Sequence, residues 1–403
     1  MSKLSYLEKL LDGVEVEWKS LGQLVVDKFW IMPATPKFNE AETIPYITSK
    51  NIKGGHINFD KTKFISREEH IELSRNRPIL AGDFLISMIG TIGEVAVVKE
   101  SDLEFYGQNM YLIRLDESVI MSRYFWHFFD SPRMKSYFQA VKNNSGQGYL
   151  KANNIDSLEV PIPCPNNPEK SLAIQAEIVR ILDAFTAMTA ELTAELNMRK
   201  KQYNYYRGQL LSFEEGDVEW KTLGDLAENL DSKRKPITSG LREAGEIPYY
   251  GASGIVDYVK DYIFDGDYLL VSEDGANLLA RNTPIAFSIS GKTWINNHAH
   301  VLKFETYAER KYVEYYLNSI DLTPYISGAA QPKLNKKNLE SIKIPNPAPK
   351  EKERIVAILD KFDSLTCSIK EGLPREIELR QKQYEYYRDL LLSFPKSHSD
   401  EAA

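Results

Sequence analysis

Apolar residues recur in alternating steps of four and three through the middle of the chain, from Ile178 to Leu210. This spacing lines up one face of a helix as a seam, which is typical of a coiled coil. Residues 171–207 contain no Pro or Gly, so we expect one helix of about 35 residues and about 52 Å. The seam positions that carry this prediction are Leu182, Phe185, Leu192, Leu196, Tyr203 and Tyr206.

A second seam follows the same spacing near the C-terminus until Leu373, where two steps of four fall together. Such a stutter locally unwinds a supercoil, and Gly372 and Pro374 stand at the same place. We therefore expect a kink or break there. We expect the two long segments to pack antiparallel; the alternative is that each is an ordinary amphipathic helix buried on its own domain. The second set of seam positions is Leu359, Phe362, Ile369, Leu373, Tyr384 and Tyr387.

The chain is a diverged tandem repeat, and the repeat predicts its architecture. Between the matched blocks the two copies differ strongly, so two dissimilar domains alternate with two similar helices. Three blocks recur in the same order: residues 17–22 at 219–224, 178–185 at 355–362, and 201–207 at 382–388.

Each dissimilar domain mixes strand-like and helix-like segments. Runs rich in Val, Ile and Tyr at 84–89, 95–98 and 268–271 predict strands, while 122–129 and 308–317 predict short helices. We therefore expect an α+β fold with two mixed α/β domains separated by two long antiparallel coiled-coil helices. The expected parts are an N-terminal segment (1–23), a first domain (24–167), a central helix (168–213), a second domain (214–348), a C-terminal helix (349–394) and a flexible tail (395–403).

The N-terminus repeats the end of the central helix. Leu10-Leu11 before Trp18 echoes Leu210-Leu211 before Trp220. This predicts that the N-terminal segment docks near the C-terminal helix, which gives the molecule a circular arrangement with a rough two-fold axis.

Composition narrows the class of protein. Two cysteines, Cys164 and Cys367, lack a CxxC spacing, which favours a reducing cytoplasm over a disulfide framework. No secretory signal and no apolar run of about 20 residues is evident, so we expect a cytoplasmic protein without a membrane span. The net charge of −7 argues mildly against nucleic acid, so a DNA-binding hypothesis requires local basic surfaces.

Each dissimilar domain has one basic stretch without Asp or Glu, at the same place in the repeat: residues 131–155 and 322–339. Each stretch contains a polar loop, Ser145–Lys151 and Ser327–Asn335. Lys suits phosphate, Gln and Asn suit bidentate readout of adenine, and Gly lets a backbone approach closely. These loops therefore predict binding of double-stranded DNA, whereas the alternative is an ordinary polar surface loop.

Further polar residues complete the two candidate sites. In the first domain the candidates are Ser49, Lys50, Asn51, Lys53, Thr91, Gln108, Asn109, Lys142, Ser145, Gln147, Tyr149 and Lys151. In the second domain they are Tyr250, Ser253, Arg281, Asn282, Lys292, Asn296, Asn297, His298, Ser327, Gln331, Lys333, Asn335 and Lys336.

Motifs for catalysis are weak, and we expect neither a catalytic nor a metal site. Gly291-Lys292-Thr293 matches the end of a P-loop pattern, but the flanking 284–289 and 294–302 look like strands, so Gly291-Lys292 is expected to be a hairpin turn rather than a helix start. His298 and His300 have the spacing of two metal ligands without a supporting carboxylate cluster. Residues 346–349 (Asn-Pro-Ala-Pro) lack the aromatic residue of an adenine methyltransferase site.

The central helix carries a doubled tetrad, Thr189-Ala-Glu-Leu192 followed by Thr193-Ala-Glu-Leu196. With the alternation of helices and dissimilar domains, this resembles the specificity subunit of type I restriction-modification systems, in particular its C branch. The resemblance covers nearly the whole chain in architecture. In sequence it is strong at 5–20, 168–224 and 350–394, and weak inside the dissimilar domains.

The resemblance implies a non-catalytic, phage-defence subunit whose two target recognition domains each read one half of an asymmetric, gapped DNA site. It implies that the helices set the gap and dock two adenine methyltransferase subunits, and that restriction subunits join outside. S-adenosylmethionine would belong to the methyltransferase, and ATP and Mg²⁺ to the restriction subunit. The alternatives are a self-sufficient nuclease or methyltransferase, and a DNA-binding scaffold or regulator outside any restriction enzyme.

Overall fold

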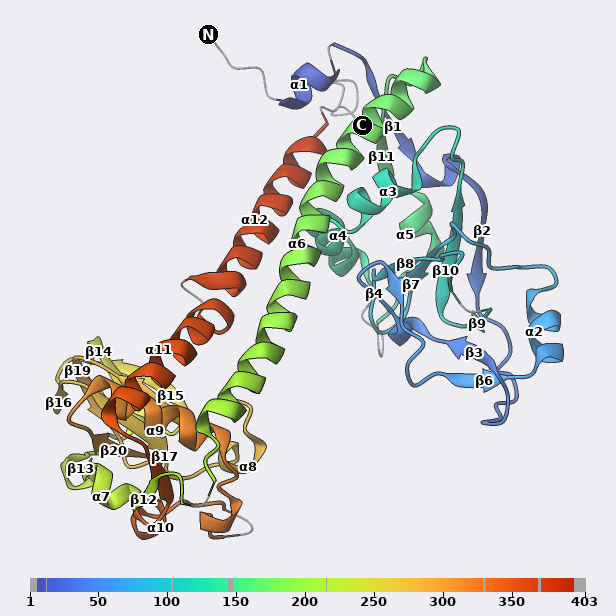
Figure 1. Cartoon of the computed structure of the whole chain (residues 1–403). Coiled ribbons are helices and arrows are strands. Elements are labelled where there is room, and N and C mark those ends of the chain that lie inside the picture. Colours follow the sequence, from blue (N-terminus) through green and yellow to red (C-terminus); the bar gives the residue numbers. More distant parts are fainter. Residues whose placement is uncertain are drawn as a thin grey trace. The chain divides into compact units, whose positions relative to one another are not determined.

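The computed structural model describes residues 6–11, 13–102, 104–143, 148–214, 216–328, 331–368 and 371–394. Within these limits the chain divides into two compact units: Met1–Glu191 with Ile377–Ala403, and Leu192–Glu376. The division passes through the long helix α6 (Pro168–Leu211) and just after the start of α12 (Gly372–Leu391). Each unit therefore contains one of the two dissimilar domains and one stretch of paired helix (Figure 1).

Within its described residues, the first unit contains four small sheets. Its helices are α1 (Tyr6–Leu11), α2 (Arg67–Ser74), α3 (Ser122–Phe129), α4 (Pro132–Val141) and α5 (Ala152–Asp156). Its strands are β1 (Val16–Ser20), β2 (Val25–Ile31), β3 (Ile44–Ile47), β4 (Ile52–Lys53), β5 (His56–Ile57), β6 (Lys63–Ile65), β7 (Phe84–Ser87), β8 (Val95–Val97), β9 (Tyr106–Gly107), β10 (Met110–Leu115) and β11 (Glu159–Pro163).

The second unit has a related arrangement of helices and strands. Its helices are α7 (Leu223–Leu226), α8 (Asn277–Ala280), α9 (Tyr307–Ser319), α10 (Lys336–Glu340) and α11 (Pro349–Thr366). Its strands are β12 (Glu219–Thr222), β13 (Glu228–Asn229), β14 (Ala244–Gly251), β15 (Gly254–Val259), β16 (Phe264–Asp265), β17 (Tyr268–Ser272), β18 (Ala286–Ile289), β19 (Lys292–Ile295), β20 (Ala299–Lys303) and β21 (Lys343–Asn346).

The two domains share a strand topology that their sequences do not show. The order β2-β10-β7-β8 in the first matches β13-β20-β17-β18 in the second. The two-stranded pair β1-β11 matches β12-β21, and the parallel pair β3-β9 matches β14-β19. The central strands β7 and β17 are almost fully buried, as expected for strands covered on both faces. The repeat therefore extends through the folds of the dissimilar domains.

Most of the predicted elements are confirmed. The helix expected at 122–129 is α3, the one expected at 308–317 is α9, and the three predicted strands are β7, β8 and β17. One prediction was wrong in detail: 294–302 is two strands, since residues 296–298 separate β19 from β20. Gly291-Lys292 is also not a hairpin turn, because β18 pairs with β17 while β19 pairs with β14 and β16. A P-loop would need Lys292 to begin a helix, but Lys292 begins strand β19, so the rejection of a P-loop is confirmed.

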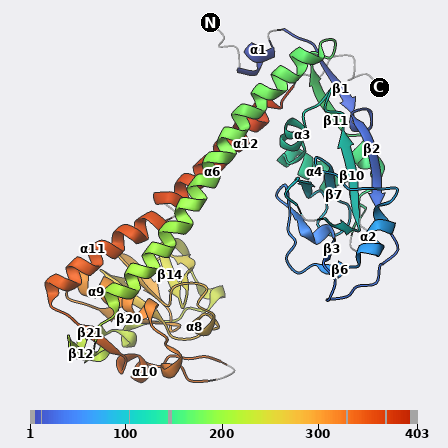
Figure 2. The same cartoon turned by 45° about the vertical axis from the view of Figure 1, so that its right-hand side comes forward.

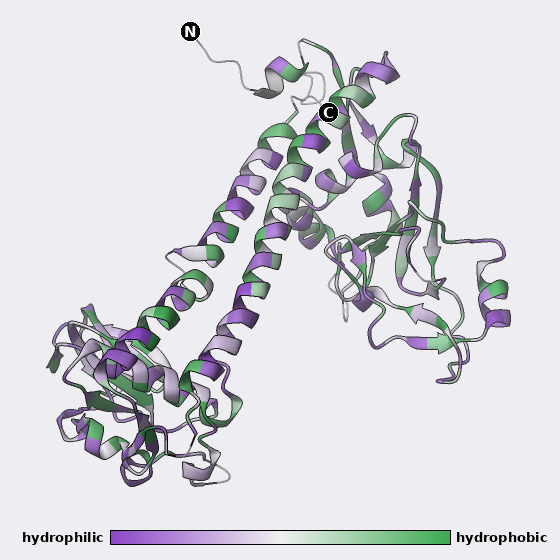
Figure 3. Ribbon diagram, viewed as in Figure 1, coloured by the Kyte–Doolittle hydropathy of each residue, from purple (hydrophilic) through white to green (hydrophobic). Residues whose placement is uncertain are grey.

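The central helix α6 has 44 residues, from Pro168 to Leu211, so it extends beyond the stretch 171–207 that contains no Pro or Gly. Proline is well tolerated in the first turn of a helix because its missing N–H has no partner there. Figure 3 shows hydrophobic and hydrophilic residues alternating along this helix. Among the described residues, no helix combines the length and apolar character needed to cross a membrane.

Aromatic stacking pairs the helices in each unit. In the first unit the ring of Phe185 on α6 stacks on Tyr387 of α12, with 5.2 Å between centroids. In the second unit Tyr206 of α6 stacks on Phe362 of α11 at 5.6 Å. Within each unit, the segment of α6 and its partner helix run antiparallel (Figures 1 and 2).

The other seam positions follow the same division. Leu182, Leu359 and Tyr203 are buried, whereas Tyr384, Leu192, Leu196 and Leu373 are half-buried. Ile369 lies outside the described residues. Leu11 of α1 belongs to the same hydrophobic cluster as Leu391 and Phe394, which places the N-terminal segment at the C-terminal helix within the first unit.

The predicted break in the second seam is confirmed, because α11 ends at Thr366 and α12 begins at Gly372. Gly372 has a φ of 77°, in the left-handed region that favours glycine. A Cβ at this position would collide with the carbonyl oxygens of Ser364 and Leu365. The break is therefore built into the chain by one glycine.

We predict that Gly372→Ala lowers the free energy of unfolding of the second unit by about 1–3 kcal/mol. An alanine here is destabilised both by the left-handed backbone conformation and by the collision of its Cβ with the carbonyl oxygens. Gly208→Ala is the matched control: Gly208 lies inside α6 with open space around its Cα, and the change should be neutral or stabilise by about 0.5–1 kcal/mol. Urea unfolding of both variants measures this. Equal effects of the two substitutions would contradict the assignment of the break to Gly372.

Candidate DNA interface

The polar loop of each domain is closed and docked in the same way. In the first loop (residues 143–151) Asn143 pairs with Tyr149, and the Leu150 N–H donates to the carbonyl of Met88 at 2.9 Å. In the second loop (residues 327–335) Ser327 pairs with Lys333, and the Leu334 N–H donates to the carbonyl of Glu273 at 2.8 Å. The loops are thus equivalent, each held just past the end of the central strand, β7 or β17. Ser145 and Gln147 lie outside the described residues.

Four candidates of the first domain gather at this end of β7. The Thr91 hydroxyl donates to the Ser49 carbonyl at 2.8 Å, across 42 residues of chain. Asn109 has a φ of 66° and its carbonyl accepts from the Met88 N–H at 3.3 Å, which is how it reaches the loop's docking point. Gln108 beside it is half-buried and lies 3.4 Å from the Tyr46 hydroxyl.

Some of the other first-domain candidates use their side chains in hydrogen bonds within the protein, and others are exposed. The Asn51 amide is used within the fold, because its oxygen accepts from the Thr48 N–H at 2.9 Å and its nitrogen donates to the Asn58 carbonyl at 2.8 Å. The Lys142 ammonium donates to Gln139 at 2.8 Å, and the Tyr149 hydroxyl accepts from Asn143 at 3.1 Å. The exposed cations among these candidates are Lys50, Lys53 and Lys151.

In the second domain a matching set surrounds the end of β17. The Glu273 N–H donates to the His298 carbonyl at 2.9 Å, and the His298 ring lies 2.9 Å from Asp274. The Asn296 N–H donates to the Tyr250 carbonyl at 3.1 Å, and Asn296 also caps the backbone of His298. Beside this set the exposed candidates are Ser253, Asn297, Ser327, Gln331, Lys333 and Lys336, while Asn335 caps α10.

Three second-domain candidates lie elsewhere in the unit. Lys292 stands at the opposite end of β19, with its ammonium 4.6 Å from the centre of the Tyr262 ring. Arg281 and Asn282 follow α8 and line a cavity of about 520 Å³ together with Tyr203 and Arg207 of α6. Burial lowers the pKa of Arg281 from its usual value, and the neighbouring Arg207 lowers it further, although Asp321 opposes this.

The basic stretches contain no Asp or Glu, but acidic side chains from outside them lie beside their lysines in the fold. The ammonium of Lys333 lies 3.1 Å from Glu273, and Lys336 lies 3.6 Å from Glu340. In the first domain Lys135 pairs with Asp130 at 2.7 Å. The acids come from just outside each stretch, or from a distant strand, which a search along the chain does not reveal.

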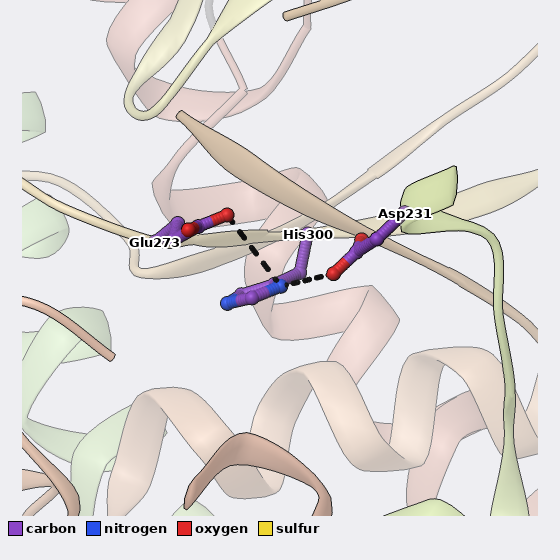
Figure 4. Close-up of side chains that lie close together, drawn as sticks. All are labelled: Asp231, Glu273 and His300. Atoms are coloured by element: carbon purple, nitrogen blue, oxygen red, sulfur yellow. Dashed lines mark hydrogen bonds and ion pairs between the residues drawn. The ribbon is translucent and has the colours of Figure 1, made fainter. Parts of the chain in front are cut away.

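A buried ionic cluster beneath the second loop was missed by the sequence analysis. His300 is 1% exposed, and its ring lies between Asp231 at 2.6 Å and Glu273 at 3.8 Å (Figure 4). Hence the expectation that no carboxylates gather near these histidines was wrong. It arose because Asp231 is 69 residues away from His300 in sequence.

The three residues could in principle hold a metal ion, because their ligand atoms lie within 4.8 Å of one another. Basic groups already occupy the carboxylates, however: Arg234 donates to Glu273 at 2.6 Å and lies 3.4 Å from Asp231. His298 points to Asp274 instead, so the two histidines do not converge. The cluster is an ion-pair network within the fold rather than an open metal site.

In each unit the domain makes a hydrogen bond to an Asp of a long helix, and we call this contact the joint. In the first unit His127 of α3 contacts Asp183 of α6 at 2.8 Å and the Tyr384 hydroxyl of α12 at 2.9 Å. In the second unit the Tyr315 hydroxyl of α9 donates to Asp360 of α11 at 2.6 Å. Asp183 and Asp360 occupy the same position in the repeated block. Each joint therefore uses the same repeated helix carboxylate and a different residue from the domain.

The comparisons with known proteins agree with this architecture. Two domains of one topology, each presenting a polar loop and each fixed to paired helices, define a duplicated two-site binding protein. A family model described as the type I restriction modification DNA specificity domain matches residues 14–199 and 215–379. The chain therefore belongs to this family of type I restriction-modification specificity proteins.

Individual relatives match along nearly the whole chain. The chain is 39% identical to the Escherichia coli type I restriction enzyme EcoR124I/EcoR124II specificity subunit, covering 98% of each chain. It is 36% identical to the E. coli EcoprrI specificity subunit, covering 92% of this chain and 93% of that one. The fold resembles the crystal structure of the type I restriction-modification S subunit from M. genitalium, with a TM-score of 0.58 at 15% identity over 96% of this chain and 98% of that one.

We predict that the first joint makes stability depend on pH. Burial lowers the pKa of His127 to about 4, although its hydrogen bond to Asp183 raises it. Because this folded-state pKa lies below the value of about 6.5 for an exposed histidine, the stabilisation is complete above pH 6.5 and is lost as the pH falls toward 4. Between pH 7 and pH 4.5 the loss attributable to His127 is about 2 kcal/mol.

The measurement compares urea unfolding of the first unit in the intact chain and in His127→Gln, at both pH values. The variant keeps a polar side chain but does not titrate, so its stability should fall by about 2 kcal/mol less. Parallel losses in the two proteins would contradict a neutral, buried His127.

Proposed function

We propose that this chain is the sequence-specific DNA-recognition subunit of a type I restriction-modification complex, and that each domain reads one half of an asymmetric, gapped site. The observation that carries the proposal is the pair of equivalent polar loops, each docked at the end of a buried central strand. Their chemistry differs at matched positions, because Tyr149 stands where the second loop has Lys333. Different side chains on one scaffold are expected to read different bases.

The chain contributes recognition, and its partners contribute chemistry. In this account an adenine methyltransferase supplies the S-adenosylmethionine site, and a restriction subunit supplies the ATP and Mg²⁺ sites. In this proposal the tandem Thr-Ala-Glu-Leu segment of α6 is the spacer, and its length sets the gap between half-sites. One tetrad adds about 6 Å of helix, comparable to one or two base-pair steps of about 3.4 Å.

Two exposed tyrosines support docking of two methyltransferase subunits. Tyr205 on α6 and Tyr386 on α12 stand at the same place in the repeat, and their exposed fractions are 63% and 64%. Aromatic side chains are enriched at protein interfaces and are often the residues that dominate binding. A repeated exposed tyrosine on each helix copy fits two equivalent partner subunits, one for each unit.

We predict that Tyr386→Ala yields a complex with one methyltransferase subunit, and that Tyr205→Ala with Tyr386→Ala yields none, because each tyrosine serves one copy. Native mass spectrometry of the chain with the methyltransferase gives the stoichiometry. Tyr262→Ala is the matched control, since Tyr262 is an exposed tyrosine (46%) in the second domain. Two subunits retained by the double variant would overturn the docking site and favour a scaffold or regulator that binds DNA alone.

We predict that Gln331→Ala relaxes specificity at one base pair of the second half-site. An exposed Gln at the loop tip suits bidentate contact with adenine, and one such contact provides about 1–3 kcal/mol of discrimination. Competition binding of the assembled complex with duplexes substituted at each position measures the effect. The first half-site is the internal control, and equal loss in both half-sites would contradict the assignment of one loop to one half.

A further inference from the structure

His300 joins the buried core of the second domain to its polar loop. Its Nε2 lies 2.7 Å from the carbonyl oxygen of Leu334, between Lys333 and Asn335 in the loop. Its Nδ1 lies 2.6 Å from the carboxylate of Asp231. A carbonyl and a carboxylate only accept hydrogen bonds, so each ring nitrogen donates and the ring carries both protons.

The surrounding charges hold this cation in place. Glu273 approaches Nδ1 to 3.8 Å and also binds Arg234 and Lys333. Burial alone would raise the pKa of Asp231, but the hydrogen bond and charge of His300 lower it overall, so Asp231 is an anion. Charge-assisted hydrogen bonds of this kind are short and directional. The ring therefore has one orientation, in which Nε2 points at the loop.

Among the described residues of the first domain, the side chain at the equivalent place does not bond the loop backbone. Met88, whose carbonyl accepts from the first loop, corresponds to Glu273, because the two carbonyls dock the two loops in the same way. Tyr111 pairs with Ile86, two residues before Met88, and His300 pairs with Val271, two residues before Glu273. Tyr111 therefore corresponds to His300. Trp30, which lies opposite Tyr111, takes the place of Asp231.

An aromatic and apolar trio in one domain thus matches an ionic trio in the other. In the first domain the Trp30 and Tyr111 rings pack edge to face at 6.4 Å, and the Tyr111 hydroxyl donates to Asp156 of α5 at 2.9 Å rather than to the loop. In the second domain the loop carbonyl is tied to a fixed donor. The difference lies directly under the two loops proposed to read different half-sites.

We propose that His300 is a positioning residue for sequence discrimination at the second half-site. Oriented by Asp231 and Glu273, it fixes the loop backbone at Leu334 and thereby sets where Gln331, Lys333 and Asn335 meet the DNA. This inference rests on the proposed function, because it assigns the second loop to base readout. It adds a buried residue that touches no DNA and acts only through the loop.

The test uses the full chain assembled with its methyltransferase, and duplexes carrying the site that the wild-type complex methylates. Discrimination is the ratio of Kd values for duplexes with and without a substituted base pair. His300→Gln should lower discrimination at the second half-site at least tenfold and leave the first unchanged. A Gln side chain retains polarity but cannot donate from two opposed ring positions.

Leu317→Ala is the control for a merely structural role, because Leu317 is fully buried in α9 of the same domain and is not part of the loop network. It should lower the Tm of the second unit without selectively lowering discrimination. Equal loss of discrimination in the two variants at matched loss of Tm would overturn the proposal.

A double variant separates this inference from the proposed function. If His300 acts through the loop, His300→Gln in a Gln331→Ala background should cause little further loss at the base pair that Gln331 reads. If Gln331→Ala alone reduces discrimination and His300→Gln does not, the positioning role is wrong and the proposed function stands. If neither change affects the second half-site, the assignment of the loop is wrong and the positioning role falls with it.

Discussion

The stacking of one aromatic ring from each paired helix is the interaction on which the rest of the structure depends. Phe185 meets Tyr387 in the first unit, and Tyr206 meets Phe362 in the second. In the first unit this pairing brings Asp183 of α6 and Tyr384 of α12 together at His127, whereas in the second unit Asp360 of α11 accepts a hydrogen bond from Tyr315 of the domain itself. Without the helix pairing, the first domain would lose part of its joint, because Tyr384 reaches His127 from the partner helix.

The two domains show which parts of the repeat are kept and which change. Strand order, the docking of the polar loop and the helix carboxylate of the joint are common to both. The side chains beneath and within the loop differ, as Tyr111 and His300 illustrate. Such a division lets one scaffold carry different DNA contacts, because substitutions at the end of the central strand leave the joint with the helices untouched.

The sequence predicted the helices and the break at Gly372 well, since heptad spacing and a glycine with a following proline are local signals. It predicted the strands around 84–97 and 268–271, but it joined β19 and β20, because no Gly or Pro in the polar residues 296–298 marks the turn between them. The cluster around His300 could not be predicted from one sequence. Its acids come from distant segments, and only the pairing of β13, β17 and β20 brings them together.

The central claim is that this chain selects the DNA sequence on which a partner methyltransferase acts. The most direct measurement is a genome-wide map of methylated adenine in a methylation-free host that expresses the chain with the methyltransferase encoded beside it. Our account predicts one asymmetric motif in two parts, separated by a gap shorter than a helical turn of about 10 base pairs, and absent when the chain is omitted. An unmethylated genome, despite a stable complex of the two proteins, would contradict it.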